Sequence, residues 1–112
     1  MIIAIPVTNN KLDNHFGHCK EFALVKTDLE KKKILSQEIV QAPPHQPGLL
    51  PKWLAQLGTN MVIAGGIGQR AKDLLNNHNI EVLVGASQET PEKLVKIYLE
   101  GNMKLGENCC DH

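Results

Sequence analysis

Residues 2–7 form an uninterrupted apolar run, Ile-Ile-Ala-Ile-Pro-Val, which constrains the fold more than any other feature of the chain. Alternating apolar and polar residues would indicate a strand with one face in water. A continuous apolar run instead indicates a strand that is covered on both faces. The sequence therefore predicts a central strand with packing layers above and below it, and Pro6 predicts an end or a bulge near its carboxyl terminus.

Strand and helix patterns alternate along the rest of the chain. Residues 8–20 are polar and are expected to form a loop. Two strand patterns, 22–27 and 34–41, are joined by a charged turn and predict a hairpin. After the proline-rich crossover at 42–48, helical patterns at 49–57, 67–75 and 90–101 alternate with apolar strands at 61–64 and 80–84. Thr90 and Pro91 are typical of a helix cap and first turn.

This order of elements predicts an α/β fold with three layers. Right-handed crossovers make the later strands parallel to the first, while the early hairpin adds antiparallel strands. The expected sheet is mixed and five-stranded, with the order 3-2-1-4-5. A chain of 112 residues with 42% hydrophobic content suits one domain. We expect that α/β domain to span residues 1–102 and to be followed by a flexible Cys/His tail at 103–112.

The charge balance argues against several classes of partner. Twelve basic and twelve acidic residues give a formal net charge of zero, so no basic field attracts nucleic acid or an anionic membrane. No apolar run approaches the roughly 20 residues of a membrane span, and the amino terminus lacks the features of a signal peptide. Three cysteines are too few for a disulfide framework. These features predict a cytoplasmic protein with free thiols.

The segment His15-Phe16-Gly17-His18-Cys19 gathers two imidazoles and one thiol directly after the central strand. Nitrogen and sulfur donors suit zinc, copper or iron-sulfur species better than magnesium or calcium. An alternative interpretation is structural: Phe16 fills the core, Gly17 makes a turn, and the histidines cap backbone groups. Both interpretations stay open at this point.

Two further groups of soft donors lie elsewhere in the chain. The tail Cys109-Cys110-Asp111-His112 contains two thiols, a carboxylate and an imidazole, although it is also consistent with an unstructured end that carries incidental cysteines. His45 is alone in the proline-rich crossover, which is typical of a solvated side chain. It would supply a third imidazole to the metal site if the crossover and the first loop lie at the same edge of the sheet.

The segment Gly65-Gly66-Ile67-Gly68 follows a strand and precedes a helix, where backbone amides bind anions. Gly66, Gly68 and Ala71 also match a dinucleotide fingerprint, but only one further strand follows, so a nucleotide-binding half would be incomplete. An alternative is that these glycines only allow the strand and the helix to pack closely. A small-molecule or anion site for phosphate or nucleotide at residues 65–68 is the competing hypothesis to metal binding.

Catalytic motifs are missing from the chain. It contains no phosphate-binding Gly-x-x-x-x-Gly-Lys-Ser/Thr loop, no Gly-x-Ser-x-Gly elbow and no paired carboxylates on the strands. An enzyme that uses Cys19 as nucleophile and His15 or His18 as base remains a third hypothesis. The sequence favours a binding protein over an enzyme.

Taken together, these motifs resemble the dinitrogenase iron-molybdenum cofactor biosynthesis family, which includes NifX-type proteins and the carboxyl-terminal domain of NifB. The resemblance runs through the apolar first strand, His15-Phe16-Gly17-His18-Cys19, Phe22, the loop at 45–48, Ala64-Gly65-Gly66-Ile67-Gly68 and the final helix. Each motif is weak alone, whereas the combination is specific.

The resemblance implies a ribonuclease-H-like α/β fold that transiently binds and transfers an iron-sulfur or iron-molybdenum-type cluster without catalysis. It implies partner proteins that donate and accept the cluster, and we expect a monomer or weak homodimer; zinc is a further candidate metal. The positions that match the family's binding role are His15, His18, Cys19, His45 and Gly65 to Gly68. Cys109, Cys110 and His112 are proposed as additional ligands on their own chemistry.

Overall fold

The structure is a computed structural model, and it describes residues 1–13, 16, 19–44 and 48–103. Its elements are β1 (Ile2–Thr8), β2 (Lys11–Leu12), β3 (Glu21–Asp28), β4 (Lys33–Gln41), α1 (Leu49–Gln56), β5 (Met61–Ile63), α2 (Gln69–Asn77), β6 (Glu81–Leu83) and α3 (Pro91–Leu99). Every strand and helix that the sequence pattern predicts is present. Among the described residues, no helix combines the length and apolar character needed to span a membrane.

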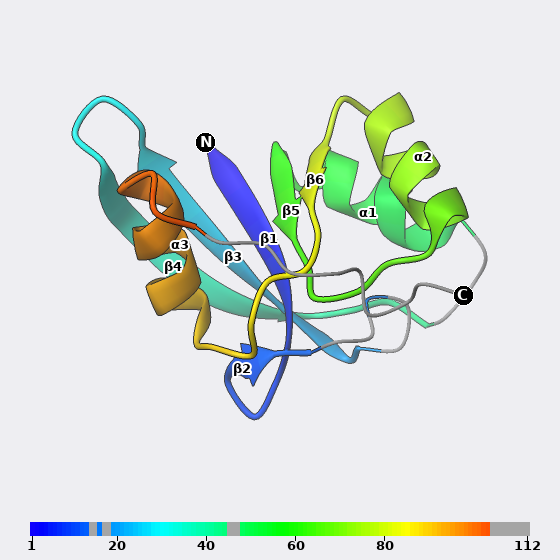
Figure 1. Cartoon of the computed structure of the whole chain (residues 1–112). Helices are drawn as coiled ribbons and strands as arrows, with labels where there is room; N and C mark the ends of the chain where they lie inside the picture. Colours follow the sequence, from blue (N-terminus) through cyan, green and yellow to red (C-terminus); the bar gives the residue numbers. More distant parts are fainter. Residues whose placement is uncertain (14–15, 17–18, 45–47, 104–112) are drawn as a thin grey trace.

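All the strands belong to one mixed sheet, in which β4, β3, β1, β5 and β6 follow one another and β2 pairs with β1 off this path (Figure 1). The β1–β3 and β3–β4 pairs are antiparallel, whereas the β1–β5 and β5–β6 pairs are parallel. The sheet therefore differs in detail from the prediction. The five predicted strands lie along the expected path, but the count of five is wrong because the sheet has six strands.

The sixth strand, β2, lies in a segment that the sequence analysis assigned to a loop. Asn9 and Asn10 have φ angles of 53° and 63°, so both adopt the left-handed conformation that a tight hairpin turn requires. The turn brings Leu12 opposite Val7, and the Leu12 side chain is buried. Asparagine tolerates this conformation better than most residues, which makes Asn9-Asn10 a hairpin signal that the prediction missed.

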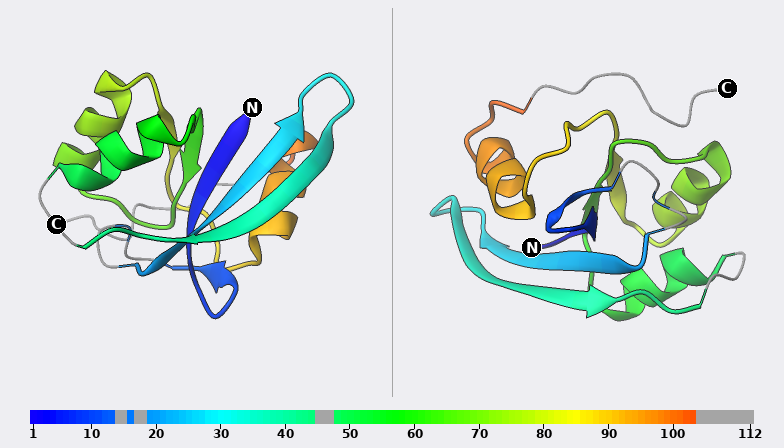
Figure 2. Two further views of the ribbon diagram at one scale, coloured as in Figure 1. Left: turned by 180° about the vertical axis from the view of Figure 1, so that it is seen from behind. Right: turned by 90° about the horizontal axis from the view of Figure 1, so that it is seen from below.

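Helices cover both faces of the sheet, as the uninterrupted apolar run predicts (Figure 2). Ile3 and Ile5 point into the core beneath α3, whereas Ala4 between them belongs to the core beneath α1 and α2. All three side chains are fully buried. The three-layer arrangement is therefore confirmed, while the ribonuclease-H-like topology implied by the resemblance stays a prediction.

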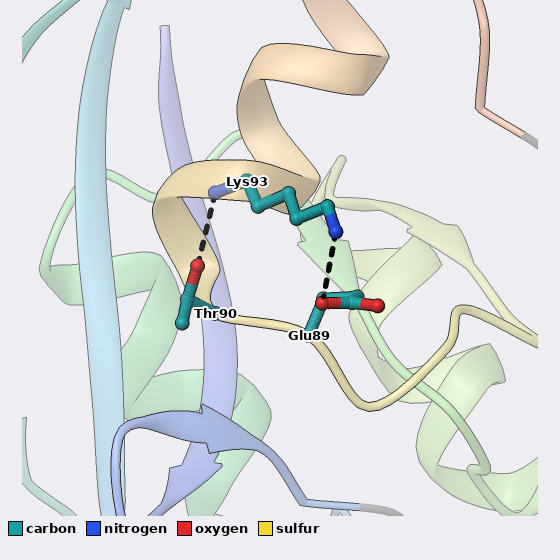
Figure 3. A network of polar contacts seen from close by, with 3 residues as sticks. All are labelled: Glu89, Thr90 and Lys93. Carbon is teal, nitrogen blue, oxygen red and sulfur yellow. Dashed lines mark hydrogen bonds and ion pairs between the residues drawn. The ribbon is translucent and has the colours of Figure 1, made fainter.

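The predicted cap of the last helix is present. Thr90 Oγ1 accepts a hydrogen bond from the backbone N–H of Lys93 at 3.3 Å, and Pro91 occupies the first turn (Figure 3). Lys93 Nζ also lies 3.3 Å from Glu89 Oε2, although both side chains are substantially exposed and the ion pair adds little stability. The backbone N–H of Leu12 donates to the Glu89 carbonyl at 2.9 Å, which joins β2 to the segment before α3.

Candidate functional site at the carboxyl edge of the sheet

The connecting segments after β1, β4, β5 and β6 leave the sheet at one edge, and the first three contain the candidate ligands selected from the sequence. β1 and β5 are parallel neighbours, and β4 also runs parallel to β1 because β3 is antiparallel to both. The segments that follow these strands, 9–20, 42–48 and 64–68, therefore begin at the same edge (Figure 1). Ligand sites in α/β sheets form at such carboxyl edges, where loops from neighbouring strands meet.

Phe16 anchors the first of these segments to the body of the domain. Its side chain is only 2% exposed and packs edge-to-face against Phe22, with ring centroids 5.6 Å apart. Phe22 contacts Trp53 of α1 in the same manner at 5.7 Å. Trp53 itself is only partly buried, so it packs at the margin of this core. The structural interpretation of Phe16 as a core residue is confirmed.

Cys19 lies beside Phe16 and is 8% exposed. Its thiol donates a hydrogen bond to the Phe16 carbonyl oxygen at 3.2 Å. Burial raises the pKa of the Cys19 thiol from 9.0 to about 12, and the negative charge of Asp13 adds to the rise. The group is therefore a neutral thiol at physiological pH, whereas a metal ligand must be a thiolate.

Asp13 is a residue of this edge that the sequence analysis did not select. Its carboxylate accepts a hydrogen bond of 2.7 Å from the Thr8 hydroxyl, and its backbone N–H donates to the Pro6 carbonyl at 2.8 Å. These two bonds fix Asp13 at the end of β1, close enough for its charge to act on Cys19. The only sequence feature that could have drawn attention to Asp13 was its position two residues before His15.

The proline-rich crossover begins next to the first segment. The backbone N–H of Ala42 donates to the Lys20 carbonyl at 2.8 Å, directly after Cys19. Ala42 and Leu50, which flank the crossover, pack against the same apolar cluster as Phe16 and Cys19. The crossover therefore starts beside the first loop, and the place of His45 at this edge stays a prediction.

The glycine segment at 64–68 joins the same cluster through Ala64 and Ile67, both buried. Gly65 and Gly66 are buried, whereas Gly68 is exposed and stands at the amino-terminal end of α2. The Gly65 carbonyl accepts a 3.1 Å hydrogen bond from the N–H of Gly85. Gly68 has a φ of −70° and open space around its Cα, so neither its conformation nor crowding demands glycine there.

The selected residues divide into two groups. Cys19, Gly65, Gly66 and Gly68 are described, and the first three are buried at one edge. His15, His18, His45, Cys109, Cys110 and His112 lie outside the described residues. Within the described ranges, no group of three or more His, Cys, Asp or Glu side chains is placed to hold a metal ion. The metal site thus remains a prediction.

Comparison with known proteins adds a family assignment to this geometry. The sequence model of the family described as dinitrogenase iron-molybdenum cofactor matches residues 1–101. An uncharacterized protein of Methanocaldococcus jannaschii, MJ0580, is 31% identical, and the match covers 96% of this chain and 92% of that protein.

Solved structures match the fold closely. The crystal structure of PH0822 has a TM-score of 0.86 at 27% identity, and the match covers 94% of each chain. The apo form of the orange protein from Desulfovibrio gigas has a TM-score of 0.72 at 20% identity, with coverage of 96% of this chain and 93% of that one. At this identity, the second likeness concerns the fold alone.

Proposed function

The chain belongs to the dinitrogenase iron-molybdenum cofactor family, and on this premise we propose that it binds and transfers an iron-sulfur or iron-molybdenum-type cluster. We propose a non-catalytic accessory role in the cytoplasm, with cluster donor and acceptor proteins as partners. The observation that carries the proposal is that segments 9–20, 42–48 and 64–68 begin at one edge of the sheet and that each contributes described residues to the apolar core on the α1/α2 face. Every ligand proposed within the domain belongs to one of these segments.

The chemistry of the donor set fits a transient cargo. A permanently bound cluster is normally held by several thiolates, whereas Cys19 is the only cysteine in the described residues. To act as a ligand, Cys19 must leave its hydrogen bond with the Phe16 carbonyl and lose its proton. Both steps oppose binding, so the affinity is lowered and increases with pH. A carrier that releases its cargo to an acceptor requires such limited affinity.

Anaerobic reconstitution with ferrous iron and sulfide tests the proposal. We expect the wild-type protein to retain iron with the visible absorption of a cluster after desalting. The triple variant His15→Ala/His18→Ala/Cys19→Ala should lose both signals. His78→Ala is the matched control, because His78 is exposed at the end of α2 and away from the proposed site.

A parallel variant separates the contribution of the tail. Cys109→Ala/Cys110→Ala/His112→Ala should reduce the retained iron only if the tail supplies ligands. Equal iron content and absorption in the wild-type protein and in the His15/His18/Cys19 variant would exclude the first segment as the site. Zinc and molybdate, offered in place of iron, distinguish the metal that the site prefers.

The amino-terminal end of α2 supports a second candidate, an anion site at residues 65–68. Gly68 is exposed there, and α2 has no side-chain cap. Backbone N–H groups at such an end bind phosphate-like anions. Gly68→Pro removes one N–H while its φ of −70° suits proline, and Gly68→Ala retains the N–H as a control. If this site functions, titration with inorganic phosphate should detect binding that only the proline variant weakens.

A further inference from the structure

Strand β4 forms one edge of the sheet. It is nine residues long and, in the described part of the chain, pairs only with β3. Figure 2 shows it as the long outer strand of the sheet, on the side opposite β6. Long edge strands present a row of backbone groups that another strand can pair with.

The side chains of β4 are unusually apolar for an exposed edge. Leu35 is 63% exposed and Ile39 is 45% exposed, and the third large apolar side chain exposed among the described residues, Leu29, lies in the turn just before β4. Natural edges are commonly protected by charged residues, proline or β-bulges, and of these β4 has an irregularity at Leu35. Between Ile34 and Gln41 this strand has a single charged residue, Glu38, and no proline.

The sequence of β4 is symmetric about Gln37 in its apolar pattern. Apolar residues occupy the positions two and three residues away on each side of Gln37. In an antiparallel pair of two such strands centred on Gln37, Leu35 of one copy lies opposite Ile39 of the other, whereas Ile34 and Val40 pack on opposite faces of the sheet and form no cross-strand pair. We infer that β4 is a homodimer interface, at which two copies of this chain pair edge to edge through this register.

The proposed register also matches the charges. Lys33 lies opposite Gln41, and Glu38 lies opposite Ser36, so no like charges face each other. Like charges directly opposite each other destabilise a strand pair, whereas apolar cross-strand pairs stabilise it. A shift by one residue in either direction removes the Leu35–Ile39 pairing, which makes the centred register the favoured one.

The packing of β4 on its own domain is consistent with this interface. Ile39 is opposite Ala23 of β3, which belongs to the core beneath α3, so Ile39 lies on the α3 side of the sheet. The β3–β4 register shifts between the pairs Lys26–Ser36 and Thr27–Ile34. Leu35 is the extra residue of β4 at this shift. Such a residue is not paired within its own sheet. The partner's Leu35 beside Ile39 extends the apolar layer across the two-fold axis.

The proposed dimer leaves the carboxyl-edge sites separate. Since the two β4 strands run in opposite directions, the edges that carry segments 9–20, 42–48 and 64–68 point to opposite ends of the dimer. Each copy would bind its cargo independently. The test of dimerisation is therefore independent of the test of cluster binding.

Sedimentation equilibrium over a series of concentrations tests the inference on the full chain without metal. A single strand pair is a small interface, so we expect a weak dimer that dissociates at roughly micromolar concentrations. The variants Leu35→Lys/Ile39→Lys and Leu35→Glu/Ile39→Glu place like charges opposite each other and should each be monomeric. An equimolar mixture of the two should form a one-to-one dimer, because every Lys then faces a Glu.

Leu29→Lys is the matched control, since it removes an exposed apolar side chain next to β4 but outside the strand. It should dimerise like the wild type. Far-ultraviolet circular dichroism of every variant checks that the domain is folded. A wild-type protein that is monomeric up to about 1 mM overturns the inference. A dimer that resists both charged variants, or charged variants that do not pair when mixed, overturns it equally.

Discussion

The Cys19 thiol is expected to be nearly unreactive in the folded protein. Its pKa is raised from 9.0 to about 12, mainly because the side chain is buried. At pH 8 a cysteine of pKa 9.0 has about one thiolate in ten molecules, whereas a pKa of about 12 leaves about one in ten thousand. Since the thiolate is the nucleophile, the reaction of folded Cys19 with Ellman's reagent should be about a thousandfold slower than that of an ordinary cysteine.

The assay uses the Cys109→Ser/Cys110→Ser variant, in which Cys19 is the only thiol. The reaction rate is measured in buffer and in urea, and the unfolded protein provides the rate of the exposed cysteine. The folded rate should also continue to increase with pH well above 9. Equal rates in buffer and urea at pH 8 would refute both the burial of Cys19 and the elevated pKa derived from it.

Three further predictions concern the Cys19 thiol, the Phe16 ring and two glycines at helix ends. The folded state holds the Cys19 proton more tightly than the unfolded state, so this contribution to stability is complete below pH 9 and is lost as the pH rises towards 12. Urea denaturation should show a steeper loss of stability above pH 9 for the wild type than for Cys19→Ala, and parallel curves would contradict this. Phe16→Ala should lower the free energy of unfolding by about 3–5 kcal/mol, because a 2% exposed ring is removed from the core; a loss below about 1 kcal/mol would indicate that Phe16 is not a core residue. Gly58→Ala should lower the melting temperature, since Gly58 has a φ of 84° and an added Cβ would lie 3.4 Å from Ile2 Cδ1, whereas Gly68→Ala should leave it unchanged or slightly raised. A lower melting temperature for Gly68→Ala than for Gly58→Ala would contradict this reasoning from backbone conformation.

The periodicity of apolar residues predicted most of the fold. The run at 2–7 identified the central strand because residues pointing to both faces are apolar, and both faces are covered in the structure. The alternation of strands and helices then fixed the path of the sheet through the handedness of crossovers. Thr90 and Pro91 located the start of α3 because capping chemistry is local.

The elements that the sequence did not predict depend on single backbone conformations or on tertiary contacts. β2 has only two residues, too few for a periodic pattern, and its hairpin turn depends on left-handed Asn9 and Asn10. Trp53 falls on the apolar face of α1 by spacing, yet its ring is only partly buried, whereas its neighbour Leu54 is fully buried. Spacing indicates a direction around a helix but not the depth of burial.

The candidate site was predicted only in part. Family resemblance and soft donors selected Cys19, but the burial that keeps its thiol protonated depends on Phe16, Phe22 and the segment at 64–68 packing together. The influence of Asp13 on Cys19 likewise depends on the hairpin turn after β1, whose Asn9-Asn10 signal the prediction missed. The sequence therefore identifies candidate ligands, whereas the structure determines the protonation state of the one that is described.

Metal analysis of the protein purified without oxygen tests the central claim most directly. Iron, molybdenum, zinc and acid-labile sulfide are measured for the wild-type chain and for the His15→Ala/His18→Ala/Cys19→Ala variant, both checked for folding by circular dichroism. We expect iron and sulfide, with or without molybdenum, to accompany the wild-type protein and to be absent from the folded variant. Wild-type protein that contains no more iron and sulfide than the variant, and gains none on anaerobic reconstitution, would contradict the account.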